Sequence, residues 1–140
     1  MSTTLTRILR AAARKPGEPL NILWCVSTHW PQELPAPHLH FAIHGGADWP
    51  AGEPPEKLTV ITKTRLCEDV PMDVVVSLDD HKSYAHARKV AYMFHLPHIA
   101  SGPGNLEEGA GQGVLRVSES PDWPSVIEEA ASLTITGEWT

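Results

Sequence analysis

The sequence contains only two cysteines, Cys25 and Cys67, and each lies among apolar residues. One pair is far from the disulfide framework that stabilises small secreted domains. We therefore expect both thiols to be reduced, as is usual in the cytoplasm.

Long apolar runs are missing too. No stretch approaches the roughly 20 apolar residues that a membrane-spanning helix requires. Near the amino terminus, Arg7, Arg10 and Arg14 interrupt the apolar residues, so the core of a secretory signal peptide is not formed. The sequence therefore predicts a cytoplasmic protein without a membrane partner, or a virion-associated protein if it comes from a phage.

Basic residues are few: the sequence has 11 Lys and Arg but 17 Asp and Glu, which gives a net charge of −6. Four of the basic residues, Arg7, Arg10, Arg14 and Lys15, precede the first acid, so the remaining residues carry −10, which is −6 minus +4. An acidic body argues against nucleic acid as a partner, since neutralising phosphates requires many basic groups. The first fifteen residues are the exception.

Common catalytic and cofactor motifs are also lacking. The sequence has no GxSxG nucleophile elbow, no HExxH or paired CxxC, and no phosphate-binding GxGxxG or GxxxxGK loop after the first expected strand. Eight histidines keep a metal site as an alternative: His38 and His40 would share one face of a strand, and His44 or the group Asp79, Asp80 and His81 could complete the site. We expect no bound metal, because the other histidines are scattered.

The most informative stretch runs from residue 72 to residue 104. Val74, Val75 and Val76 form a β-branched run that is typical of a parallel strand covered on both faces. Apolar residues at three- or four-residue spacing then predict a helix from about His81 to His95, which ends before Pro97. With a strand at residues 98–100, this forms a βαβ unit with a right-handed crossover.

The rest of the chain predicts an α/β fold, a single Rossmann-like domain with a mostly parallel open sheet of about five strands and flanking helices. Residues 1–17 are expected to form a basic amphipathic N-terminal helix, and residues 18–140 the Rossmann-like domain. Prolines between the first two strands leave room for about one helical turn near residues 32–34. Further strands are expected at residues 20–26, 38–44, 57–65 and 114–117, a helix after Asp122, and a short strand or a packed tail at residues 133–135.

Small or polar residues follow several of these strands. In an open α/β sheet the carboxyl ends of the strands form one rim, and ligands bind there where the strand order reverses. If the first and fourth strands are neighbours, Ser27, Thr28 and His29 face Ser77, Asp79 and Asp80. The candidate ligand-binding residues are Ser27, Thr28, Gly45, Gly46, Ser77, Ser101 and Gly102, and the catalytic candidates, if the chain is an enzyme, are His29, Asp79 and Asp80.

A structural role for the same residues is the alternative. Polar residues after a strand often serve only the local turn, and one of the two aspartates could cap the long helix.

Three stretches together resemble a known family: NILWCVSTHW, PHLHFAIHGGADW and MDVVVSLDDHKSYAHARKVAYMFHLPHIASGPG. They resemble the amino-terminal half of bacterial and phage glycosyltransferase-like proteins of the GT-B type. The matching positions are Trp24, Cys25, Ser27, Thr28 and His29 in the first block, His40, Phe41 and Trp49 in the second, and 73–99 in the third. The resemblance implies a Rossmann-like fold and covers about residues 20 to 104.

Two functions are compatible with this resemblance. Enzymes of this type bind a nucleotide-sugar mainly with a second, carboxyl-terminal domain. We expect this chain to have no room for such a domain. We therefore expect a non-catalytic interaction or structural subunit of a larger assembly, with a protein partner or further copies of itself and no cofactor. If the chain comes from a phage, that assembly would be a phage assembly. The alternative is a glycosyltransferase-like component that uses a nucleotide-sugar with a donor-binding half supplied by another chain.

Overall fold

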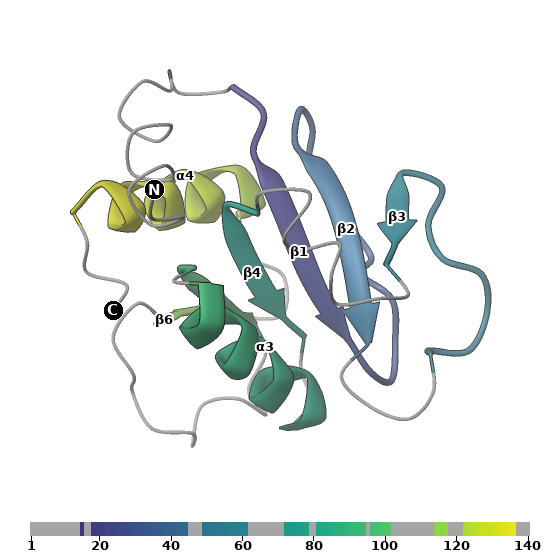
Figure 1. Ribbon diagram of the computed structural model, residues 1–140. Coiled ribbons are helices and arrows are strands. Elements are labelled where there is room, and N and C mark those ends of the chain that lie inside the picture. The colour runs from purple at the N-terminus through teal and green to yellow at the C-terminus, as the bar shows by residue number, and fades with distance from the viewer. Residues whose placement is uncertain are drawn as a thin grey trace.

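A computed structural model describes residues 15, 18–44, 49–61, 72–78, 81–94, 96–101, 114–117 and 122–136 (Figure 1). These residues form six strands and two helices. The elements are β1 (Asn21–Val26), β2 (Leu39–His44), β3 (Leu58–Val60), β4 (Val74–Ser77), α3 (His81–Phe94), β5 (His98–Ser101), β6 (Val114–Val117) and α4 (Trp123–Thr136).

The strands form one sheet in the order β3-β2-β1-β4-β5-β6, and each neighbouring pair is parallel. The chain moves outward from β1 to β3, returns to place β4 on the other side of β1, and continues to β6. The order therefore reverses between β1 and β4, where Cys25 pairs with Ser77. This is the Rossmann order, and it confirms the predicted fold class. The first and fourth strands are neighbours, which is the condition under which the candidate site residues would face one another.

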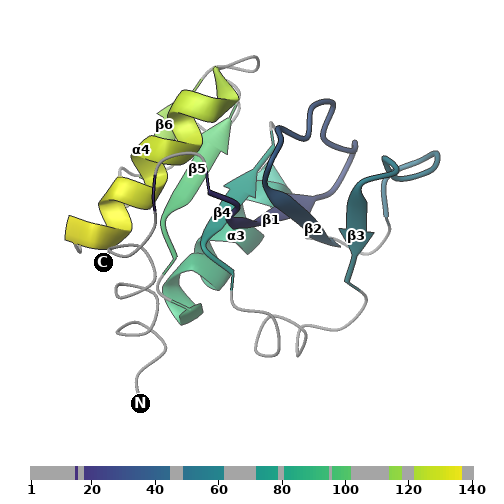
Figure 2. The same ribbon diagram turned by 90° about the horizontal axis from the view of Figure 1, so that it is seen from above.

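Two hydrophobic clusters cover the two faces of the sheet. Alternate residues of β1 enter different clusters, because successive side chains of a strand point to opposite faces. The first cluster contains Trp24 and Val76 and is covered by α4, whereas the second contains Leu23 and Val75 and is covered by α3 (Figure 2). The domain is a three-layer α/β/α structure.

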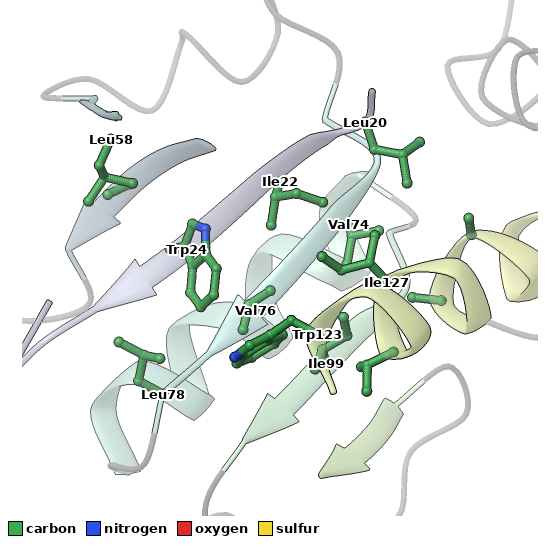
Figure 3. Close-up of a cluster of buried hydrophobic side chains, with 14 of the residues drawn as sticks. Leu20, Ile22, Trp24, Leu58, Val74, Val76, Leu78, Ile99, Trp123 and Ile127 are labelled. Carbon is green, nitrogen blue, oxygen red and sulfur yellow. The ribbon is translucent and has the colours of Figure 1, made fainter. Parts of the chain in front are cut away.

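Trp24 lies at the centre of the first cluster. Its ring centroid is 5.2 Å from that of Trp123 in α4, in an edge-to-face arrangement at 64° (Figure 3). Edge-to-face pairs of this kind add to the free energy that burial alone supplies. The contact ties the last helix to the central strand.

The central βαβ unit forms as expected. All four residues of β4 are buried. In α3, Tyr84, Ala87 and Ala91 are buried whereas Lys82 and Lys89 are exposed, which matches the predicted amphipathic spacing. The helix ends at Phe94, three residues before Pro97.

No helix lies in the described connection between β1 and β2, residues 27–38. We call this segment the β1–β2 loop. The prolines leave room for about one helical turn near residues 32–34, and no such turn forms. Pro31 and Pro35 are buried, and Trp30 and Leu34 pack against the first cluster. The loop thus fills a place over the sheet that a crossover helix usually takes. The Ala36–Pro37 peptide is cis.

The carboxyl-terminal segment differs from the expectation. Residues 133–135 were expected as a short strand or a packed tail, but α4 continues through them to Thr136. Once a helix is nucleated, adding a residue is easier than starting a new element, which explains the continuation. The helix begins where expected, and the Val126 amide donates to the Asp122 carbonyl at 3.0 Å.

Some expectations lie outside the described residues. Of the predicted N-terminal helix only Lys15 is described, and it is exposed. The third predicted strand is described as far as Ile61. Neither of the two described helices has the length and apolar character needed to cross a membrane.

The packing predicts that shortening a buried side chain of the first cluster lowers the free energy of unfolding strongly. Ile127 is fully buried in α4, so Ile127→Ala should lower the free energy of unfolding by about 2–5 kcal/mol. Glu129→Ala, at an exposed position of the same helix, is the matched control and should change it by less than about 0.5 kcal/mol. Urea denaturation measures both, and similar losses in the two variants would contradict the assigned packing.

Candidate functional site

The accessible part of the predicted site follows β1. Ser27 is half-buried, whereas Thr28 and His29 are exposed beside the point where the strand order reverses. The Thr28 hydroxyl and the His29 Nδ1 atom are 2.9 Å apart. This pair presents polar atoms to solvent at the rim where Rossmann domains bind ligands.

Two other predicted ligand-binding residues point into the protein. Ser77 and Ser101 are buried at the ends of β4 and β5. The Ser77 hydroxyl lies 2.8 Å from His98 Nε2, and the Ser101 hydroxyl donates to the Ser77 carbonyl at 3.1 Å. Both side chains are thus engaged in bonds between neighbouring strands.

The remaining predicted site residues lie outside the described residues. These are Gly45, Gly46, Asp79, Asp80 and Gly102. An interaction of His29 with Asp79 or Asp80 therefore stays a prediction.

We call the place between β1 and β4, where the strand order reverses, the switch point. Ser83, which the sequence analysis did not identify, lies at its inner end. From the first turn of α3, its hydroxyl donates to the Cys25 carbonyl at 2.5 Å and accepts the Leu78 amide at 2.8 Å. The hydroxyl therefore connects β1, the end of β4 and α3. Ser83 therefore forms hydrogen bonds with two backbone groups that would otherwise be available to a ligand between β1 and β4.

The distance between the Ser77 hydroxyl and His98 Nε2 would suit a catalytic nucleophile and its base, but the proton positions would not. Arg88 Nη1 lies 3.4 Å from His98 Nδ1, and a guanidinium can only donate hydrogen bonds. His98 Nδ1 therefore accepts, which puts the proton of the neutral ring on Nε2, the atom that faces Ser77. A nitrogen that already carries a proton cannot take one from Ser77, so this pair is unsuited to nucleophilic catalysis.

The two histidines considered for a metal site are engaged in other bonds. His38 Nδ1 accepts the Leu20 amide at 3.0 Å, and His40 uses both ring nitrogens, with Trp24 and Pro35 as partners. His40 could not ligate a metal without losing one of these bonds. Among the residues described, no three His, Cys, Asp or Glu side chains are grouped so that they could hold a metal ion.

His86 in α3 is a half-buried histidine whose pKa is lowered. Burial lowers its pKa below the usual 6.5, and electrostatic repulsion from His44 and Lys89 lowers it further. His86 is therefore neutral at pH 7.

An aromatic cluster lies beyond the ends of β1 and β2. Trp30 and Trp49 stack with centroids 5.7 Å apart at 13°, and His44 meets Trp49 edge to face at 4.8 Å. The Trp30 indole donates to the Gly52 carbonyl at 3.4 Å. The three half-buried rings connect the β1–β2 loop to the segment before β3. A tryptophan shortly after each of two strand ends is the sequence signal for this cluster.

Comparisons of the chain with models of known protein families, with curated proteins and with solved structures found no match.

The bridging role of Ser83 predicts a measurable loss of stability. Ser83→Ala removes a buried hydroxyl with two hydrogen bonds and should lower the free energy of unfolding by about 1–3 kcal/mol. Ser125→Ala, at an exposed position of α4, should change it by less than about 0.5 kcal/mol. Chemical denaturation compares the two, and an unchanged midpoint in Ser83→Ala would contradict the role.

Proposed function

We propose that the chain is a non-catalytic interaction subunit of a larger assembly, built on a trimmed glycosyltransferase-like Rossmann scaffold. The observation that carries the proposal is the occupied switch point. A Rossmann domain binds the phosphates of its ligand at the amino terminus of the helix that follows the first strand. Here residues 27–38 contain no such helix, and Ser83 bonds the backbone groups between β1 and β4.

The surface of α3 supports an interaction role. Tyr92 and Met93 are adjacent near the end of this helix and are 82% and 67% exposed. Lys89 lies one turn earlier and is exposed as well. Tyrosine and methionine are enriched at protein interfaces, where their large side chains supply apolar contact. We propose this end of α3 as part of the contact surface, with a protein partner or another copy of the chain.

A glycosyltransferase-like component remains the second candidate, because Thr28 and His29 are exposed at the rim. In this alternative His29 acts as a general base, oriented by Asp79 or Asp80, and another chain supplies the half that binds a nucleotide-sugar. Phage origin and a cytoplasmic or virion location belong to the first proposal and depend on the family resemblance.

The association surface can be tested with a double variant, Tyr92→Gln with Met93→Gln. Because both side chains are exposed, the fold should be kept while association is lost. The variant should self-associate at least tenfold more weakly in sedimentation experiments, or lose a protein that the tagged wild-type chain retains from its native cells.

Leu39→Gln is the matched control, because Leu39 is a 56% exposed hydrophobic residue at the start of β2. It should behave like the wild type. A wild-type chain that sediments as a monomer and retains the same proteins as the double variant would contradict the proposal.

A further inference from the structure

His40 in β2 is held by two buried hydrogen bonds. The Trp24 indole N–H donates to His40 Nδ1 at 2.9 Å, and His40 Nε2 lies 2.9 Å from the Pro35 carbonyl. An indole can only donate and a carbonyl can only accept. His40 is therefore a neutral ring with its proton on Nε2, and both of its nitrogens are used.

Protonation of His40 is incompatible with this arrangement. A second proton on Nδ1 would face the Trp24 indole N–H, so two donors would oppose each other inside the protein. Trp24 is fully buried and packed against Trp123, so it has little freedom to move. The His40 ring must shift instead, and its bond to Pro35 in the β1–β2 loop is then lost.

We propose that His40 is an acid-sensitive latch that holds the β1–β2 loop on the sheet at neutral pH and releases it in acid. The loop carries Thr28 and His29 at the rim, so its release would rearrange the accessible part of the candidate site. This inference is independent of the proposed function, because it concerns the loop whether the rim binds a ligand, a protein or neither.

The surroundings of His40 favour the neutral ring. Burial lowers its pKa below the usual 6.5, and the smaller effect of the bond to Pro35 opposes this shift. His38 lies two residues earlier, and its Nδ1 accepts the Leu20 amide. The titratable groups on the neighbouring segments are His29 and Glu33 in the loop, Glu53, Glu56 and Lys57 before β3, and Asp122 before α4, all exposed, together with the half-buried His44 at the end of β2. None of them is a cause of the shift at His40.

The sign of the pH dependence follows from the lowered pKa. The closed loop favours neutral His40, whereas the released loop lets the pKa return toward 6.5. The latch is therefore fully effective above about pH 6.5 and weakens as the pH falls toward the lowered pKa. Within that window the released population should grow by up to about tenfold per pH unit, because one proton is taken up.

Hydrogen exchange measures the release. The protection factor of the Trp30 indole N–H, which lies in the loop and donates to the Gly52 carbonyl, should fall between pH 7.5 and pH 5.5 after correction for the intrinsic effect of pH. The protection factors of the β1 and β4 amides should stay nearly constant, apart from the general loss of stability that His86 contributes. Nitrogen NMR of the His40 ring should show protonation over the same pH range.

Two variants isolate His40. His40→Asn offers an acceptor to Trp24, and His40→Gln offers a donor to Pro35, but neither side chain titrates. In both, the acid-dependent fall in protection of the loop should disappear. His86→Gln and His29→Gln should keep the response, since one removes a half-buried histidine that also has a lowered pKa and the other removes an exposed histidine of the same loop.

The proposal is overturned if the loop responds to acid equally in His40→Asn and in the wild type. It is also overturned if His40 stays neutral until the whole domain unfolds. The second criterion needs only the wild-type protein, so it holds even if the His40 variants fail to fold.

Discussion

The prolines of the β1–β2 loop are the constraint on which much of this structure depends. Pro31, Pro35 and Pro37 prevent a helix in a connection where a Rossmann domain normally has one. The first face of the sheet must then be covered in that region by the loop itself, through Trp30 and Leu34. The loop needs its own attachment to the sheet, and His40 supplies it by bonding the Pro35 carbonyl. The same constraint removes the helix terminus at which a nucleotide phosphate would bind.

The other side of the switch point is organised by α3. Its first turn carries Ser83 between β1 and the end of β4, and its next turns carry Tyr84 and Arg88 beside the buried His98. Ser83 bonds two backbone groups, and His98 bonds Arg88 and Ser77, so these buried polar groups have hydrogen-bond partners. Among the described residues, Thr28 and His29 are exposed at the rim, and Tyr92 and Met93 are exposed at the end of α3. That distribution favours a scaffold that presents surfaces over a site that encloses a ligand.

The sequence was sufficient for the fold and only partly sufficient for the site. The valine run of β4 and the spacing of α3 predicted the central unit correctly, because each is a strong local pattern. The reversal between β1 and β4 was only a condition in the sequence analysis, since strand order depends on contacts between distant segments. Residues 133–135 were predicted wrongly, since a short β-branched run does not show that an existing helix continues through it. The bridging role of Ser83 depends on contacts between distant segments. The same holds for the tautomers of His98 and His40, which are set by Arg88 and Trp24. No local pattern could therefore predict them.

The most direct test of the central claim, that the chain's own groups occupy the place of a nucleotide ligand, is thermal unfolding of the purified protein with a panel of nucleotides and nucleotide-sugars. A ligand at about a hundred times its dissociation constant would stabilise the fold by roughly 2.7 kcal/mol and visibly raise the midpoint. The account predicts no shift with any member of the panel. A raised midpoint with one nucleotide class that disappears in His29→Ala would contradict it and favour the transferase alternative.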